Sequence, residues 1–243
     1  MNSENIEGWN EKQKILVVLA HPDDPEFFCG AMIARWCGTG HEVRYCLLTQ
    51  GQKGTQDPDM SPEKLAVIRK VEQQNAANLL GVASVEFLDY VDGELFPDNQ
   101  MRLEVVKVIR RWQPTILVAS DPRNLFPTDR RINHPDHRAA GQVVIDAAFP
   151  AAGNPSFYPE LVKNDHLPPH TIREVWLSAT AQPNLIVDMT AYFDRKLEAI
   201  HCHRSQINED LAVFDRHMHE RFVKDEITGE SVYYEQFFRI ILG

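Results

Sequence analysis

Short apolar runs alternate with amphipathic stretches along this chain, and the alternation predicts strands and helices in turn. The runs at 15–20 and 115–119 are continuous and rich in β-branched residues, which is typical of strands buried on both faces. The same criteria place further strands at 43–49, 85–88, 174–177 and 185–187. Helices are predicted over about 29–37, 61–80, 102–112, 135–148, 190–203 and 210–220. This order predicts an α/β fold with a Rossmann-like, doubly wound and mostly parallel sheet.

The length of the chain favours one domain. Of its 243 residues, 43% are hydrophobic and 25% are charged, which suffices for a sizeable core and argues against disorder as the main state. We expect residues 1–243 to form a single domain, with a core over about 14–206 and a C-terminal helical extension over about 207–243. The segment 150–169 is rich in Pro and Asn with little periodicity, so it is expected to be an irregular surface loop.

The net charge and the lengths of the apolar runs argue against some classes of function. The chain has 25 Lys and Arg against 35 Asp and Glu, a net charge of −10, which argues against a nucleic-acid partner. The longest clean apolar run is far shorter than the 18 or more residues of a membrane span, and the first residues lack the pattern of a signal peptide. We therefore expect a cytoplasmic protein without a membrane span.

Two short motifs carry candidate chemistry. His21-Pro22-Asp23-Asp24 directly follows the first predicted strand, and His134-Pro135-Asp136-His137 opens the helix after the fourth. In a Rossmann-like strand order the first and fourth strands are neighbours, so their carboxyl ends border the same crevice. Either motif alone could be a capped turn or a surface feature. At the ends of two neighbouring buried strands, they are expected to meet and form one site.

The residue types in the two motifs match a hydrolytic zinc site. Such a site takes three protein ligands from His, Asp or Glu and keeps a fourth position open to water. His21, Asp24 and His137 supply three ligands of these kinds. The sequence therefore predicts them as the metal-binding set.

The remaining side chains of the motifs are predicted to act in catalysis. Adjacent side chains leave a turn in different directions, so Asp23 is free to face the attacking water and is the predicted general base. His134 is predicted to stabilise an oxyanion or to protonate a leaving amine. Asp136 is expected to orient the His134 imidazole, as carboxylates often do.

Substrate contacts are harder to predict from the chain alone. Charged side chains near the expected crevice are ordinary surface charges in most proteins, but those in bordering segments are expected to touch substrate. The predicted contacts are Lys53, Arg69, Arg123 and Asp129. The residues Phe27, Phe28, Met32 and Trp36 fall at helical spacing and are assigned to the core.

The chain resembles the LmbE-like, or PIG-L, family of zinc-dependent N-deacetylases. The resemblance rests on Ala20 to Asp24 and on His134 to His137, which match the two signatures of that family. It implies one LmbE-like deacetylase domain that removes the acetyl group from an amino sugar or a related small molecule. The implied cofactor is Zn²⁺, with other divalent metals open, and the implied partner is a small N-acetylated sugar or glycoconjugate. Formation of a homo-oligomer stays open.

The same resemblance implies roles for individual residues. His21, Asp24 and His137 would hold the zinc ion, and Asp23 would be the base. His134 would assist as electrophile or acid. These roles agree with those inferred from the residue types.

Two alternatives from other classes remain. A non-catalytic nucleotide-binding or sensory module could use the same fold, although neither a Gly-x-Gly-x-x-Gly motif after the first strand nor a P-loop is present in the sequence. A non-haem iron enzyme could use the same two histidines and one carboxylate. Dependence on oxygen would distinguish the iron enzyme from a hydrolase.

Overall fold

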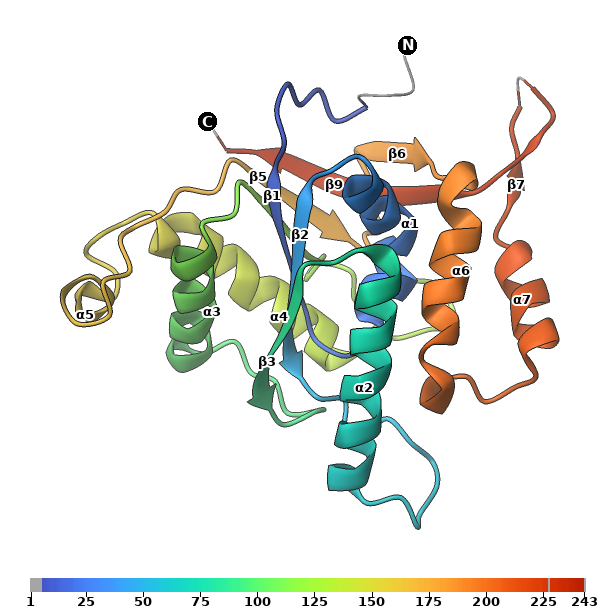
Figure 1. Cartoon of the computed structure of the whole chain (residues 1–243), viewed down its shortest axis with the longest axis horizontal. Helices are drawn as coiled ribbons and strands as arrows, with labels where there is room; N and C mark the ends of the chain where they lie inside the picture. The colour runs from blue at the N-terminus through green and yellow to red at the C-terminus, as the bar shows by residue number, and fades with distance from the viewer. Residues whose placement is uncertain (1–5, 227, 243) are drawn as a thin grey trace.

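A seven-stranded sheet forms the centre of the protein, seen in a computed structural model that describes residues 6–226 and 228–242 (Figure 1). The strands lie in the order β3-β2-β1-β4-β5-β9-β6. Their bounds are β1 Lys14–Leu19, β2 Glu42–Thr49, β3 Ser84–Tyr90, β4 Ile116–Ser120, β5 Glu174–Ser178, β6 Leu185–Asp188 and β9 Tyr234–Ile241. The strands β1 to β5 pair in parallel, whereas β9 runs antiparallel to both β5 and β6. The expected α/β sheet is therefore confirmed.

Helices cover both faces of this sheet, as the doubly wound prediction requires. The α-helices are α1 Asp24–Gly38, α2 Pro62–Leu80, α3 Asn99–Trp112, α4 Pro135–Asp146, α5 Pro159–Lys163, α6 Phe193–His201 and α7 Leu211–His219. One apolar cluster packs α1, α2 and α6 against the sheet, and a second packs α3 and α4 against the opposite face. Short helical turns lie at Ala147–Ala152, Thr190–Tyr192 and Arg204–Gln206. A small two-stranded antiparallel ribbon pairs β7 Val223–Lys224 with β8 Ser231–Val232.

Local sequence signals explain why most helix ends agree with the prediction. The Ser61 hydroxyl accepts a hydrogen bond from the Lys64 backbone N–H at 3.2 Å and so begins α2. Gly81 ends α2 in the left-handed conformation, with φ of 85°. In contrast, α1 begins five residues earlier than the predicted start at 29, because its first turn overlaps the His-Pro-Asp-Asp motif. Asp24, the last residue of the motif, therefore lies in the first turn of α1, and Asp23 lies at the N-cap position.

The region after residue 206 differs most from the prediction. The expected helical extension over 207–243 is wrong, because only Leu211–His219 is helical among its described residues. Tyr234–Ile241 instead forms β9, which lies inside the main sheet and buries Phe237 completely. Charged residues interrupt the apolar pattern of β9, and their buried ion pairs are not visible in the sequence. The segment 150–169, expected to be irregular, contains the short helix α5.

A break in α1 is stabilised by a buried ion pair. Cys29 departs from helical geometry, with φ of −148° and ψ of 28°. The backbone N–H groups at positions 31 and 32 donate to the Glu235 carboxylate of β9, at 3.1 and 2.8 Å. Lys196 of α6 donates to Glu235 at 2.7 Å and to the Phe27 carbonyl at 2.9 Å, and both ionic side chains are buried. The ion pair therefore satisfies backbone groups that the break releases.

The length and the apolar character of the helices bear on membrane insertion. In the described ranges, no helix combines the length and the apolar character that crossing a bilayer requires.

Candidate active site

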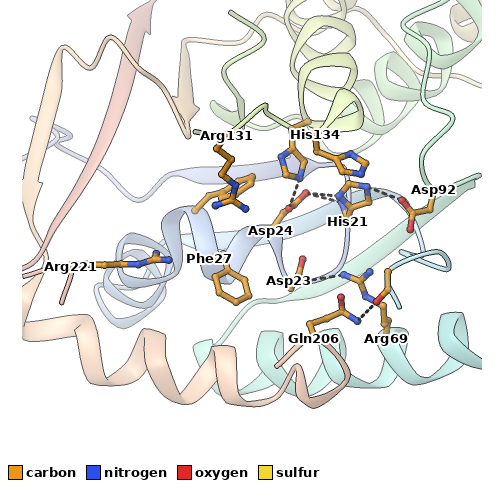
Figure 2. A pocket seen from close by; sticks show the side chains of 13 residues that line it. His21, Asp23, Asp24, Phe27, Arg69, Asp92, Arg131, His134, Gln206 and Arg221 are labelled. Atoms are coloured by element: carbon orange, nitrogen blue, oxygen red, sulfur yellow. Dashed lines mark hydrogen bonds and ion pairs between the residues drawn. The ribbon is translucent and has the colours of Figure 1, made fainter. Parts of the chain in front are cut away.

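A cleft of about 520 Å³ opens where β1 and β4 end side by side (Figure 2). The loop after β1 leads into α1, and the loop after β4 leads into α4. The cleft is lined by His21, Asp23, Asp24, Phe27, Phe28, Gly54, Arg69, Asp92, Arg131, His134, His137, Gln206 and Arg221. The two predicted motifs therefore meet in one cleft, as the strand order implied.

Two imidazoles face one carboxylate at the floor of this cleft. The Asp24 carboxylate lies 3.0 Å from His137 Nε2 and 3.4 Å from His21 Nδ1. Burial alone would raise the pKa of Asp24, but the neighbouring His137 and His21 imidazoles hold it well below its usual range. Burial disfavours the charged form of His21, yet Asp24 raises the pKa of this imidazole well above its ordinary value. The three side chains form a tight and strongly polar cluster.

The second nitrogen of each imidazole is anchored away from the cluster. His137 Nδ1 lies 3.1 Å from the Asn133 side-chain oxygen. His21 Nε2 lies 3.1 Å from Asp92 and 3.2 Å from Asp136. Hydrogen bonds of this kind fix the ring orientation and leave the other nitrogen available to a metal.

The predicted role of Asp136 must be corrected. We expected its carboxylate to orient His134, but it contacts His21 and accepts hydrogen bonds from the Gly93 and Leu95 backbone N–H groups, at 2.6 and 3.2 Å. These donors lie in the loop after β3, which sequence reasoning did not connect to the motif. Asp136 therefore joins the β3 loop to His21.

Two overlapping groups of side chains have the spacing of a metal site. One consists of His21, His134 and His137, and the other consists of His21, Asp92 and Asp136. The second group is buried, and its carboxylates serve as hydrogen-bond partners of His21 Nε2. Asp24 belongs to neither group, but its carboxylate oxygens lie 3.0 Å from His137 Nε2 and 3.4 Å from His21 Nδ1. These distances are short enough for Asp24 to share a metal ion with the two histidines. The donor set at the cleft floor therefore includes Asp24.

Asp23 occupies an unusual backbone conformation beside this cluster. It has φ of 87°, a region that non-glycine residues rarely adopt. Its N–H donates to the Gln73 side chain at 2.8 Å, and its carboxylate lies 3.2 Å from Arg69 Nη2. Burial raises the pKa of Asp23 to about 6, against the opposing effect of the Arg69 guanidinium. The adjacent Asp23 and Asp24 carboxylates thus have different partners and opposite pKa shifts.

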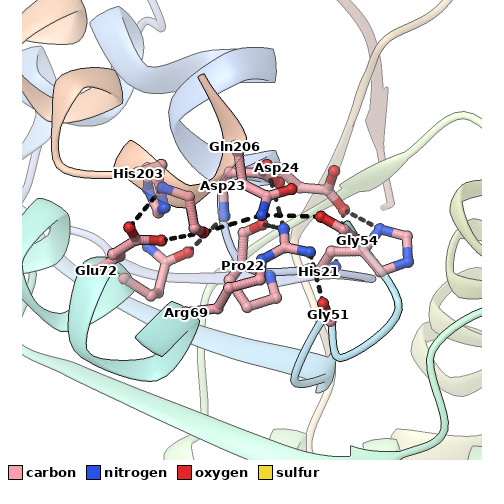
Figure 3. A network of polar contacts seen from close by, with 12 residues as sticks. His21, Pro22, Asp23, Asp24, Gly51, Gly54, Arg69, Glu72, His203 and Gln206 are labelled. Carbon is pink, nitrogen blue, oxygen red and sulfur yellow. Dashed lines mark hydrogen bonds and ion pairs between the residues drawn. The ribbon is translucent and has the colours of Figure 1, made fainter. Parts of the chain in front are cut away.

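Arg69 connects the two loops that border the cleft (Figure 3). Its guanidinium donates to the Gly51 carbonyl at 2.8 Å and to the Pro22 carbonyl at 2.5 Å. It fills the space that a side chain at Gly51 or Gly54 would need, since a Cβ at either position would come within 2.4 Å of Arg69 Nη1. Arg69, which we predicted as a substrate contact, lines the cleft but is mostly buried and held by these bonds.

A buried polar network lies behind Asp23. His203 Nε2 lies 3.1 Å from the Glu26 carboxylate, which also accepts from Gln73 at 3.0 and 3.1 Å. Burial would lower the pKa of His203, but Glu26 outweighs this effect and raises it. Glu72 of α2 accepts from the Ser205 backbone N–H at 2.7 Å. The network joins α1, α2 and the turn after α6.

His134 begins α4 and faces the cleft. Its Nδ1 accepts a hydrogen bond from the Asp136 backbone N–H at 3.2 Å, so it serves as the N-cap. Burial lowers the pKa of His134, and the nearby His21 and His137 rings add to this effect. The neutral imidazole with Nδ1 as acceptor carries its proton on Nε2. A hydrogen-bond donor is thus available on the other side of the ring.

Three of the predicted substrate contacts lie outside the cleft. Lys53 forms an exposed ion pair with Glu94 at 2.6 Å. Arg123 binds the Asp121 carboxylate at 2.8 Å. Asp129 is 86% exposed on the loop before His134. None of the three side chains is placed to meet a ligand at the cleft floor.

Several cleft residues were missed by sequence reasoning. Phe27 and Phe28 were assigned to the core, but both line the cleft. Asp92 lies just beyond the carboxyl end of β3, a position that could have been found from the rule that ligands bind at strand ends. Arg131 and Arg221 carry no motif and reach the cleft only through the folding of distant segments.

Comparison with known proteins adds independent information. Residues 16–148 match the model of the PIG-L family, described as GlcNAc-PI de-N-acetylase. Diacetylchitobiose deacetylase of Thermococcus kodakarensis is 37% identical over 206 residues, which cover 84% of this chain and 74% of the relative. A probable N-acetyl-alpha-D-glucosaminyl L-malate deacetylase 2 of Bacillus cereus is 27% identical over 233 residues, covering 93% of this chain and 97% of the relative.

A similar solved structure supports the fold. N,N'-diacetylchitobiose deacetylase from Pyrococcus horikoshii, complexed with its inhibitor MPG, has a TM-score of 0.84 and 32% sequence identity. The match covers 95% of this chain and 85% of that chain. The likeness therefore extends over nearly the whole α/β domain and its sheet.

Proposed function

The chain belongs to the PIG-L family of de-N-acetylases, and we propose that it is a divalent-metal-dependent hydrolase that removes the acetyl group from a small N-acetylated sugar. The relatives named above are a diacetylchitobiose deacetylase and a probable deacetylase of an N-acetylglucosaminyl malate. The observation that carries the proposal is the convergence of His21 Nδ1, His137 Nε2 and the Asp24 carboxylate in one cleft.

We infer that these three side chains would hold the metal. Their donor atoms face one another, while Asn133 and Asp136 anchor the outer nitrogens of the two rings. Two imidazoles and one carboxylate suit Zn²⁺, and they also suit other divalent transition metals. When bound, the metal would polarise the acetamide carbonyl and make water easier to deprotonate. Hydrolysis by the family favours zinc over the oxygen chemistry of a non-haem iron centre.

Asp23 is proposed as the general base. Its carboxylate lines the cleft next to Asp24, and Arg69 holds it at 3.2 Å. Because Asp23 is not needed to complete the donor set, its carboxylate can accept a proton from the attacking water. The oxygen of that water forms the new bond to the carbonyl carbon.

His134 is proposed to act on the other side of the reacting amide. Its Nδ1 is engaged with the backbone, so the Nε2–H can donate to the carbonyl oxygen as negative charge develops there. Cleavage of the C–N bond requires a proton on the leaving nitrogen, which His134 or protonated Asp23 can deliver. The products are acetate and the free amino sugar.

Acetate release tests this proposal. The purified protein is assayed on N-acetylglucosamine and diacetylchitobiose before and after chelation, with zinc or iron added back in the presence and absence of oxygen. We expect chelation to abolish acetate release and zinc to restore it without oxygen. His137→Ala is expected to lose most bound metal while the sheet stays folded. Full metal content and unchanged turnover in His137→Ala would contradict the assignment of His137 as a ligand.

A further inference from the structure

Two arginines enter the cleft from separate parts of the fold. Arg131 belongs to the loop that precedes α4, and Arg221 follows α7. Figure 2 shows Arg131 entering the cleft from above, beside Asp24, and Arg221 entering from the left, toward Phe27. Their positions in the chain are 90 residues apart, so only the tertiary fold brings them to one cavity.

Neither arginine is neutralised by the protein. Within residues 6–226 and 228–242, no carboxylate lies at ion-pair distance from either guanidinium. The cleft carboxylates are already engaged, since Asp23 contacts Arg69 at 3.2 Å and Asp24 contacts His137 at 3.0 Å. The third, Asp92, contacts His21 at 3.1 Å. The two guanidinium groups therefore leave positive charge in the cavity.

This positive charge contrasts with the rest of the molecule. The chain carries a net charge of −10, and most of its arginines donate to carboxylates or carbonyls. A guanidinium offers a planar set of donors that matches the two oxygens of a carboxylate or the oxygens of a phosphoryl group. Two such groups with no protein partner, facing the same cavity, fit an anionic group on a ligand.

The cavity has room for such a group beyond the reacting acetamide. Its volume of about 520 Å³ lies within the range of about 300–1,000 Å³ that is usual for small-molecule sites. An acetamide must reach His21, Asp24 and His137 for hydrolysis, and this requirement leaves the side near Arg131 and Arg221 for the rest of the substrate.

We propose that the substrate carries a carboxylate or phosphoryl group on the part attached to the N-acetylated sugar, and that Arg131 and Arg221 bind this group. The inference rests on the proposed deacetylase function. It separates this chain from an enzyme whose preferred substrate is a neutral N-acetylated disaccharide.

The test compares pairs of substrates in which one member carries the anionic group and the other does not. One pair is an N-acetylglucosaminide with a carboxylate on its aglycone and the methyl ester of the same compound. A second pair is N-acetylglucosamine 1-phosphate and N-acetylglucosamine, which reports on a phosphoryl group. We expect kcat/KM for acetate release to be about tenfold higher for the charged member of one pair, equivalent to about 1.4 kcal/mol. The pair that shows this preference identifies the anion.

The arginines are tested with a matched set of variants. In R131Q/R221Q the ratio of kcat/KM between the charged and uncharged members should fall to about one, because the charge-assisted hydrogen bonds are lost. The control is R130Q/R216Q, which removes the same charge from exposed positions outside the cleft on the same loop and on α7. The control should keep the ratio of the parent enzyme.

The outcomes separate the two proposals. Acetate release without any preference in the parent enzyme, or a preference that survives in R131Q/R221Q, would overturn the anion-binding role. An equal loss of preference in R130Q/R216Q would also overturn it, since the effect would then come from net charge and not from the cleft. Absence of acetate release from every substrate would instead contradict the deacetylase function itself.

Discussion

Asp23 and Asp24 are adjacent, yet the fold gives them different surroundings. Asp24 is enclosed by two imidazoles, whereas Asp23 lies at φ of 87° against Arg69. A non-glycine residue at positive φ is strained, and such strain persists where surrounding contacts hold it. Here the holding contacts are the Gln73 and Arg69 side chains. The positive φ of Asp23 therefore directs the Asp23 and Asp24 carboxylates toward different partners.

Substitution of each aspartate by asparagine should separate these tasks. Asn tolerates positive φ and keeps an oxygen for Arg69, so Asp23→Asn should fold and retain metal. Loss of the base should reduce kcat by about 10²-fold to 10⁴-fold. Asp24→Asn should instead lose metal, because the negative charge between the two imidazoles is removed. Metal content and turnover of both variants provide the measurement. If Asp23→Asn lost metal as fully as Asp24→Asn, the two roles would have to be exchanged.

The two motifs could be predicted from the sequence because each is continuous in sequence and follows a strongly apolar strand. The partner of Asp136 could not be predicted, since its contact with His21 depends on how the loop after β3 packs. Arg131 and Arg221 could not be found either. Each is a single charged residue without a local pattern, and tertiary structure alone brings it to the cleft.

A buried histidine joins α1, α2 and the turn that follows α6. His203 pairs with Glu26 of α1, while Glu72 of α2 binds the backbone at Ser205. Because burial opposes the charged imidazole but Glu26 raises its pKa, the folded protein holds this proton more tightly than the unfolded chain. The pair therefore stabilises the fold at low pH, and its contribution is lost as pH rises through the folded pKa.

His203→Gln should show this pH dependence. The variant is expected to have a lower free energy of unfolding than the parent at pH 6, and the difference should become smaller at pH 9. Urea unfolding of both proteins at the two pH values provides the measurement. His217→Gln is the control, because His217 forms only an exposed pair with Glu209 and such pairs contribute about 0–1 kcal/mol. A parent–variant difference for His203→Gln that is equal at both pH values would contradict the charged pairing.

Most elements could be predicted because their patterns are local. The strands at β1 and β4 are uninterrupted apolar runs, and α2 has a Ser cap and a terminal Gly. In contrast, β9 carries Glu235 and Arg239 among its apolar residues, and each charge is satisfied by a partner far away in sequence. A strand that depends on such partners does not have a distinctive local pattern.

Strand β9 connects the main sheet to α1, the helix whose first turn contains Asp24. Glu235 accepts from the released N–H groups of α1 and from Lys196 of α6. Removing one partner of a buried pair is strongly destabilising, since the other charge is left without compensation. The position of Asp24, in the first turn of α1, is therefore coupled to β9.

Lys196→Met should expose this coupling. We expect the free energy of unfolding to fall by about 3–5 kcal/mol, because Glu235 is left buried without its counter-charge. Metal content and kcat should fall as well, even though Lys196 does not line the cleft. Arg195→Met, one position away in an exposed pair with Glu198, should change stability by only about 0–1 kcal/mol. Equal effects of the two substitutions on stability and metal content would contradict the coupling.

The place of β9 in the chain also sets the order in which the enzyme can be assembled during synthesis. It is translated after the six other strands of the main sheet, although it lies between two of them. A nascent chain that has not yet produced β9 leaves β5 and β6 without their shared neighbour, and open strand edges invite pairing with other chains. The same unfinished chain lacks Glu235, whose carboxylate accepts hydrogen bonds from the backbone N–H groups at the break in α1. Hydrolytic competence is therefore acquired late in translation, and stalled products are expected to be inactive and prone to recognition by chaperones.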